Sequence, residues 1–185
     1  SKNNNQLTNI LSNISKDNSI LDLGCGYNYF YNKRIIDLYK SYLGIDMDYT
    51  IYNKFITEEI PRNINFILAD FCKKWDDMTI INEISIDTKF DIILITNCIH
   101  YAMVDGKLSD NFIGQINKFT NDNVRIFISF CDKTDLLTLL EKYDCIKDGA
   151  NYVKLIDKNT IKYYYSWVHY KPQTEKLLDI NILIK

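Results

Sequence analysis

A glycine turn preceded by an acidic residue is the feature of this 185-residue chain that best suits ligand chemistry. Residues 20–26 read ILDLGCG, which predicts a short buried strand over 19–23 that runs into a turn at Gly24 and Gly26. Glycines let backbone amides approach a ligand that a Cβ would keep away. The pattern therefore predicts a small-molecule site at this turn.

Two ligands suit this kind of turn, a dinucleotide and S-adenosylmethionine. A dinucleotide turn requires a third glycine at position 29, where this chain has Tyr29. Asp22 stands at the end of the strand, where it would repel a phosphate but suit the α-ammonium group of a methionine moiety. These residues favour S-adenosylmethionine as the ligand.

A second acidic residue, Asp46, ends the next apolar segment, which predicts a strand over 41–46 after a helix over about 29–40. Asp46 follows Gly26 by one helix and one strand, the length of a strand–helix–strand unit. A carboxylate at the tip of the second strand can accept hydrogen bonds from both ribose hydroxyls of an adenosine. We expect this role for Asp46; the alternative is an ordinary turn residue at a strand end.

A third acidic residue, Asp70, ends a strand predicted over 64–70. Its carboxylate could accept a hydrogen bond from the adenine amino group, with Phe71 or Cys72 lying against the base. The alternative is that Asp70 caps the following turn. The sequence leaves both roles of Asp70 open.

Residues 90–95 read FDIILI and predict the clearest strand of the chain, because buried parallel strands are almost wholly apolar. Thr96, His100 and Tyr101 follow this strand. In open α/β sheets, ligands bind beyond the carboxyl ends of the strands at the point where the strand order reverses. We therefore place Thr96 in the cofactor site, and His100 and Tyr101 just past the same edge.

The rest of the chain completes an α/β pattern. Apolar residues at helical spacing predict an amphipathic helix within 1–18. The remaining predicted elements are a helix over 51–60, an exposed connection over 73–88, a strand over 124–130, a helix over 136–143, a hairpin of 152–156 with 161–167, and a helix or strand over 174–185. Strands alternating with helices predict a Rossmann-like doubly wound sheet with helices on both faces, in a single domain.

The composition argues against several kinds of site. The net charge of −2 indicates no global nucleic-acid surface. Five widely separated cysteines and only two histidines make a zinc site improbable, and we expect no metal. Thiols inside apolar runs indicate a cytosolic setting. No apolar run reaches the roughly 20 residues that a membrane span requires, and the polar start SKNNNQ is unlike a signal peptide.

Four segments together resemble the mRNA cap guanine-N7 methyltransferase family. They are ILDLGCG, the acid after YLGID, the acid after INFILAD, and FDIILITNCIHYAM. The first three occur in S-adenosylmethionine enzymes generally, so the specific part is the Ile99-His100-Tyr101 run. The segment KPQTEKLL, residues 171–178, is similar to the family's proline–acid–apolar segment. The resemblance comes closest to the capping enzymes of cytoplasmic DNA viruses and plasmids.

This resemblance implies transfer of a methyl group from S-adenosylmethionine to N7 of the guanine cap of GpppN-ended RNA. His100 and Tyr101 would orient the guanine, and Glu175 would accept hydrogen bonds from its N1–H and N2–H₂ groups. N7 already presents a lone pair, so no residue need transfer a proton, and positioning supplies most of the rate. The alternative roles are a buried core residue for His100, an aromatic residue at the rim for Tyr101 and a solvated acid for Glu175.

The resemblance also implies a larger assembly. Where this chain stops, the family continues with a helix and a closing antiparallel strand pair. We therefore expect one methyltransferase domain over 1–185 with a truncated C-terminal end, either a piece of a larger capping enzyme or a minimal version of the domain. The expected partners are GpppN-ended RNA and, in addition, other capping-enzyme domains or an activating subunit. The expected location is the host cytoplasm, and we expect no membrane partner.

The chain departs from the family pattern at several positions, among them Tyr27, Asn28 and Asn97. Members usually carry lysine and glycine at the positions of Tyr27 and Asn28, and a bulky aromatic residue that stacks on the cap at the position of Asn97. Two further hypotheses therefore stay open. One is a methyltransferase of the same fold that acts on a small molecule or another nucleic-acid base, and the other is a non-catalytic subunit.

Overall fold

The computed structural model describes residues 2–73, 89–105, 107–130, 133–142, 145–148, 150–157, 160–164 and 173–176. The chain divides into two compact units. One comprises Ser1–Ala102 with Leu108–Ser129, and the other comprises Met103–Lys107 with Phe130–Lys185. The expectation of one methyltransferase domain over 1–185 stays a prediction.

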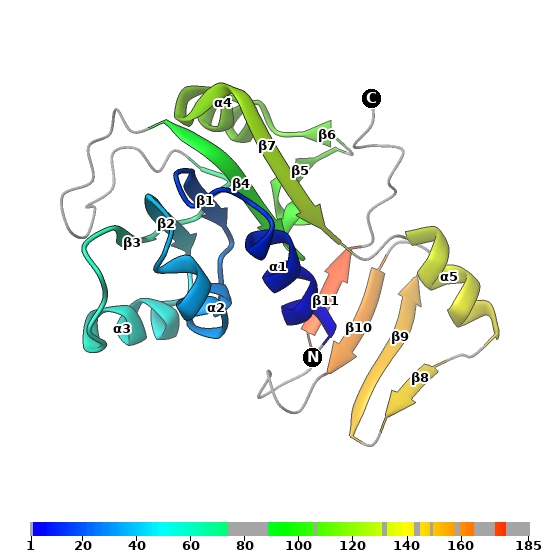
Figure 1. Cartoon of the computed structure of the whole chain (residues 1–185). Helices are drawn as coiled ribbons and strands as arrows, with labels where there is room; N and C mark the ends of the chain where they lie inside the picture. The colour runs from blue at the N-terminus through cyan, green and yellow to red at the C-terminus, as the bar shows by residue number, and fades with distance from the viewer. Residues whose placement is uncertain are drawn as a thin grey trace. The chain divides into compact units, whose positions relative to one another are not determined.

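The first unit contains a five-stranded sheet in the order β3-β2-β1-β4-β7 (Figure 1). Every neighbouring pair of strands in this sheet runs parallel. The strands are β1 Ser19–Leu23, β2 Ser41–Asp46, β3 Ile64–Leu68, β4 Phe90–Thr96 and β7 Thr120–Ser129. The chain moves outward from β1 to β3 and then restarts on the other side at β4. This reversal confirms the predicted doubly wound sheet, in which the expected ligand position lies beyond the carboxyl ends of β1 and β4.

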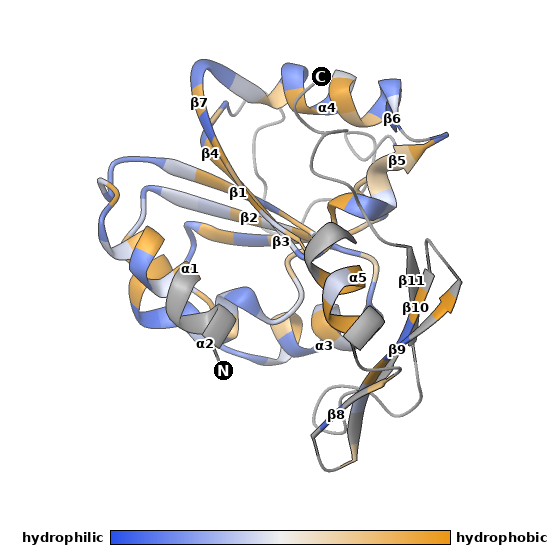
Figure 2. Cartoon of the chain, turned by 90° about the vertical axis from the view of Figure 1, so that its right-hand side faces the viewer, coloured by the Kyte–Doolittle hydropathy of each residue, from blue (hydrophilic) through white to orange (hydrophobic). Residues whose placement is uncertain are grey.

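Helices cover both faces of this sheet (Figures 1 and 2). Helices α1 Lys2–Ser12, α2 Asn28–Ile36 and α3 Tyr49–Thr57 lie on one face, and α4 Asp110–Phe119 lies on the other. The helix predicted over about 29–40 ends earlier, at Ile36, because the chain turns at Asp37 and Lys40 donates its backbone N–H to the Lys16 carbonyl at 2.7 Å. Helix α4 was not predicted from the sequence.

Aromatic rings fill the layer between α2, α3 and the sheet. Tyr29 is fully buried, with its ring centroid 5.1 Å from that of Phe55 and 5.8 Å from that of Tyr42. Phe55 in turn stacks on Phe66 of β3 at 4.8 Å. A dinucleotide turn would need glycine at the position of Tyr29, and here that position is part of the core.

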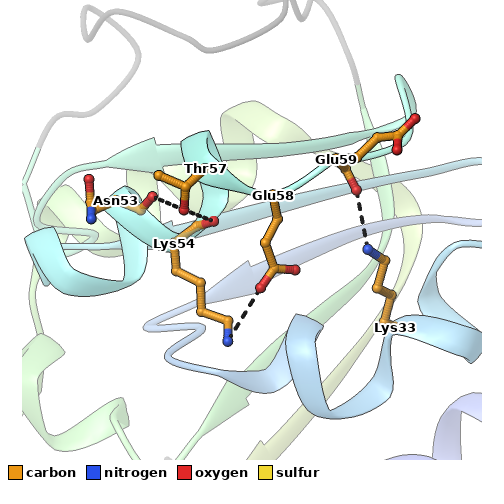
Figure 3. A network of polar contacts seen from close by, with 6 residues as sticks. All are labelled: Lys33, Asn53, Lys54, Thr57, Glu58 and Glu59. Atoms are coloured by element: carbon orange, nitrogen blue, oxygen red, sulfur yellow. Dashed lines mark hydrogen bonds and ion pairs between the residues drawn. The ribbon is translucent and has the colours of Figure 1, made fainter.

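Exposed polar contacts surround the end of α3, and one of them joins α2 to the segment that follows α3 (Figure 3). The Lys33 ammonium donates to the Glu59 backbone carbonyl at 3.2 Å, and Lys54 forms an ion pair with Glu58 at 3.4 Å. Thr57 donates its hydroxyl proton to the Asn53 carbonyl at 2.9 Å. Contacts of this kind between exposed groups contribute little to stability, so the aromatic layer holds these helices in place.

In its described residues, the second unit contains an antiparallel sheet in the order β11-β10-β9-β8 and one helix. Its elements are α5 Lys133–Lys142, β8 Cys145–Asp148, β9 Asn151–Asp157, β10 Thr160–Tyr164 and β11 Gln173–Lys176. The pairing of β9 with β10 confirms the predicted hairpin. Leu136 and Leu140 of α5 pack with Ile161 of β10 to form the core of this unit.

The other elements are short. They are the 3₁₀ helix η1 Ile99–Ala102 and the paired strands β5 Met103–Val104 and β6 Lys107–Leu108. Most of the predicted exposed connection, residues 74–88, and the last predicted segment beyond Lys176 lie outside the described residues. Across the described ranges, no helix is long and apolar enough to span a membrane.

Candidate functional site

The glycine turn follows β1 directly, and its two glycines serve different purposes. Both have positive φ, 62° at Gly24 and 49° at Gly26. A Cβ on Gly24 would lie 2.6 Å from Cys98 Sγ and 3.1 Å from Phe71 Cε1, whereas a Cβ on Gly26 would meet nothing within 4 Å. Gly24 is therefore required for internal packing, and Gly26 leaves open space where a ligand can approach the backbone.

Hydrogen bonds attach this turn to the carboxyl end of β2. The Cys25 N–H donates to the Ile45 carbonyl at 3.1 Å, and the Gly26 N–H donates to Asp46 Oδ2 at 2.8 Å. Asp46 Oδ1 accepts from the Asp48 N–H at 2.9 Å. An ionised carboxylate has about four acceptor positions, so two backbone bonds fix the Asp46 side chain and leave capacity for further donors such as ribose hydroxyls.

Asp22 lies beneath the turn and is fully buried. Its Oδ2 accepts hydrogen bonds from Tyr42 Oη at 2.8 Å and from Asn28 Nδ2 at 3.2 Å. Burial raises the pKa of Asp22 to about 7, and the bonds from Tyr42 and Asn28 counteract only part of that rise. A cation would compensate this buried carboxylate better than the two neutral donors do. The predicted contact with a methionine ammonium group stays a prediction.

Asp70 follows β3 and caps the turn after it. Its Oδ1 accepts from the Cys72 N–H at 3.0 Å, and its Oδ2 forms an ion pair with Lys73 at 3.4 Å. Phe71 is buried, with its ring centroid 6.1 Å from that of Phe112 on α4. The capping role of Asp70 is thus present in the structure, and the adenine contacts of Asp70 and Phe71 stay predictions.

The carboxyl end of β4 meets both the glycine turn and β7. Thr96 Oγ1 accepts from Asn28 Nδ2 at 2.7 Å, and Cys98 Sγ donates to the Leu23 carbonyl at 3.0 Å. Asn97 has φ of 57°, a left-handed conformation that asparagine tolerates better than most residues, and its N–H donates to the Ser129 carbonyl at 2.7 Å. Asn97, which stands where the family pattern has an aromatic residue, is therefore an exposed polar turn residue.

His100 and Tyr101 lie together on η1, directly after this turn. Their ring centroids are 4.0 Å apart, and the Tyr101 side chain is 62% exposed. Burial lowers the pKa of His100 to about 4, so its imidazole is neutral near pH 7. The pair offers an exposed ring face beside an uncharged imidazole.

The structure brings most, but not all, of the predicted site residues into one unit. The side-chain amide of Asn28 links Asp22 to Thr96, and a separate hydrogen bond joins Gly26 to Asp46. Glu175 belongs to the second unit, where it lies on β11 opposite Ile161 of β10. Its predicted role in reading guanine stays a prediction.

Sequence reasoning missed three residues that shape this site: Asn28, Tyr42 and Cys98. Asn28 stood out only as a departure from a family pattern. Tyr42 and Cys98 lie in apolar runs, where their polar atoms give no periodic signal.

Within the described ranges no cluster of His, Cys, Asp or Glu could hold a metal ion. Cys25, Cys72 and Cys98 form no disulfide bond with one another.

Comparison with known proteins identifies the fold. No family model and no curated protein sequence matches the chain. A solved S-adenosylmethionine-dependent methyltransferase from Clostridium acetobutylicum matches with a TM-score of 0.60, 14% identity and coverage of 98% of this chain and 75% of that one. The fold is that of a Rossmann-like methyltransferase.

Two further solved structures share this fold. The sugar N-methyltransferase KedS8 from Streptoalloteichus matches with a TM-score of 0.61, 10% identity and coverage of 97% of this chain and 74% of that one. The plantazolicin methyltransferase BpumL, solved with a pentazolic desmethylPZN analogue and SAH, matches with a TM-score of 0.50 and 21% identity over 80% of this chain. This chain spans about half the length of that enzyme, 51%. None of these three is named as a cap methyltransferase.

Proposed function

We propose that the first unit binds S-adenosylmethionine at the carboxyl ends of β1 and β2 and transfers its methyl group to an acceptor. The observation that carries this proposal is the 2.8 Å hydrogen bond from the Gly26 N–H to the Asp46 carboxylate, inside a methyltransferase fold. It puts a sterically open backbone and a fixed carboxylate side by side, as an adenosine ribose requires.

The acceptor that we propose first is N7 of the guanine in a GpppN RNA cap. The support is the His100–Tyr101 pair after β4, which carried the family resemblance. Methylation gives the guanine ring a positive charge, and an imidazole kept neutral by burial does not repel that charge. The exposed ring of Tyr101 offers a stacking surface for the base. Other capping domains or an activating subunit would be its protein partners.

A small-molecule acceptor is the second candidate. It is favoured by the similarity to a sugar N-methyltransferase and a plantazolicin methyltransferase among the solved structures. Asn97 also stands where cap enzymes carry a stacking aromatic residue. Transfer of labelled methyl groups from S-adenosylmethionine separates the candidates when GpppN-ended RNA is compared with GTP, ApppN-ended RNA and free amines. Methylation of GpppN-ended RNA alone supports the cap proposal, methylation of an amine supports the second candidate, and labelling of none contradicts both.

Asp46→Ala is expected to weaken S-adenosylhomocysteine binding by about 1.5–3 kcal/mol, or roughly 10- to 150-fold, because hydrogen bonds to a charged acceptor are lost. Isothermal titration calorimetry measures the two affinities. Asp17→Ala, which removes an exposed carboxylate from the turn before β1, serves as the control and should leave the affinity unchanged. Equal affinities of wild type and a folded Asp46→Ala variant would exclude Asp46 as the ribose ligand.

Glu175→Gln is expected to lower cap methylation at least about tenfold while S-adenosylhomocysteine affinity stays within about twofold. The amide replaces one acceptor with a donor and so mismatches the two adjacent donors of guanine, a contact worth roughly 1–3 kcal/mol. Rates on GpppN-ended RNA are compared with those of Glu59→Gln, which alters an exposed glutamate after α3. A wild-type rate for Glu175→Gln would show that this acid does not read the base.

A further inference from the structure

The side chain of Asn28 connects two strand ends within the proposed cofactor site. Its amide nitrogen lies 2.7 Å from Thr96 Oγ1, 3.2 Å from Asp22 Oδ2 and 3.4 Å from Asp22 Oδ1. One N–H therefore points to the end of β4 and the other to the carboxyl group on β1. Asn28 is the first residue of α2 and is half-buried, whereas Asp22 is fully buried.

Among the described residues, the carboxyl group that this amide contacts has no cationic partner. It accepts hydrogen bonds from the Tyr42 hydroxyl and the Asn28 amide, both neutral, and neither of the two ion pairs in this part of the chain includes Asp22. A buried carboxylate with only neutral donors is costly, and for that reason burial raises the pKa of Asp22 to about 7. A ligand ammonium group at the same place would supply both hydrogen-bond donors and the missing charge.

We propose that Asn28 is a specificity-determining residue whose amide nitrogen occupies the position of the cofactor's α-ammonium group and leaves it when the cofactor binds. This inference rests on the proposed S-adenosylmethionine site. An ammonium group offers three donors and can reach the same Thr96 and Asp22 oxygens. Breaking the amide contacts opposes binding of ligands that carry the ammonium group, whereas a nucleoside without an amine leaves these contacts in place. Asn28 thereby lowers the affinity of the site for aminoacyl-bearing nucleosides and leaves its affinity for nucleosides without an amine unchanged.

Removing the Asn28 side chain is expected to tighten binding of the amine-bearing ligand alone. We expect Asn28→Ala to bind S-adenosylhomocysteine about tenfold more tightly than wild type, because no amide must be displaced. The deaminated analogue, in which hydrogen replaces only the α-ammonium group, should bind both proteins within about twofold. Asn53→Ala, which alters an exposed asparagine on α3, is the matched control. Asn28→Ser, whose shorter side chain cannot span both oxygens, repeats the test if the alanine variant does not fold.

Calorimetric titration of both ligands into wild type and the variants gives distinct outcomes. Tighter binding of S-adenosylhomocysteine alone supports the role of Asn28. Unchanged or weaker binding of S-adenosylhomocysteine to a folded variant overturns that role and leaves the cofactor proposal standing. An equal gain for both ligands also overturns it, because the amide would then oppose the nucleoside in general. Binding of neither ligand to any of these proteins overturns this inference together with the proposed function.

Discussion

Gly24→Ala is expected to lower the free energy of unfolding by about 2–5 kcal/mol. A left-handed φ costs an alanine roughly 1–2 kcal/mol, and Gly24 has φ of 62°. The new Cβ would also lie 2.6 Å from Cys98 Sγ and 3.1 Å from the Phe71 ring, and overpacking of that kind costs about 1–3 kcal/mol. Both neighbours are buried, so neither can move aside without disturbing the core.

Gly26→Ala is the matched control, since it adds the same methyl group two residues later in the same turn. Gly26 also has positive φ, 49°, but its Cβ would meet nothing within 4 Å. The free energy of unfolding of Gly26→Ala should therefore fall only by the conformational cost of the left-handed φ, about 1–2 kcal/mol. Urea denaturation of the two variants measures the difference. Equal losses would show that Cys98 and Phe71 do not close over Gly24.

Asp22→Asn is expected to flatten the dependence of stability on pH. Burial raises the pKa of Asp22 to about 7 in the folded protein, against an ordinary aspartate value of 3.8. A raised folded-state pKa means that the protonated form is favoured by folding. This contribution is fully present below about pH 4 and is lost as the pH rises through about 7. Asparagine carries no charge at any of these pH values, and its carbonyl can still accept from Tyr42.

The expected size of this effect follows from the linkage relation. Between pH 5 and pH 8 the ionisation of Asp22 should lower the free energy of unfolding of the wild type by about 2–3 kcal/mol. The asparagine variant should not show this loss. Urea denaturation at pH 5, 6, 7 and 8 gives the two profiles. Asp122→Asn, at an exposed aspartate on β7, should leave the wild-type profile unchanged. Parallel profiles of wild type and Asp22→Asn would mean that Asp22 stays ionised in the folded protein throughout this range.

The sheet of the first unit was largely predictable because its strands carry their own signal. The bounds of β1 and β2 match the predicted 19–23 and 41–46, since buried parallel strands read as continuous apolar runs that end at polar turns. The predicted third strand reached Asp70, whereas β3 ends at Leu68, because Asp70 already belongs to the turn that it caps. The carboxyl ends of the strands were therefore placed to within two residues.

Helix α4 shows where the local signal was overlooked. Ser109 accepts a hydrogen bond from the Phe112 N–H at 3.2 Å, and Phe112 and Phe119 are buried against the second face of the sheet. Serine followed by Asp110 and apolar residues at helical spacing is a helix start that could have been recognised. Its end was harder to place, because Thr120 passes directly from the helix into β7.

The polar contacts of the site could not be predicted, because they depend on three-dimensional neighbours. Asp22, Asp46 and Thr96 follow from the rule that strand ends hold ligands, and each needed only its own sequence context. Asn28 and Tyr42 reach Asp22 from a helix and from a neighbouring strand, across 6 and 20 residues of sequence. Glu175 was assigned from a family resemblance, and a sequence gives no distance between two compact units.

The most direct test of the cofactor proposal is nuclear magnetic resonance of ¹⁵N-labelled protein titrated with S-adenosylhomocysteine. We expect saturable shifts of the backbone amide signals of Gly26, Met47 and Thr96, at the carboxyl ends of β1, β2 and β4. The signals of Ser19 and Ser41, at the amino ends of β1 and β2, should move much less. Unchanged signals throughout, or shifts concentrated at the amino ends of the strands, would contradict the proposed S-adenosylmethionine site.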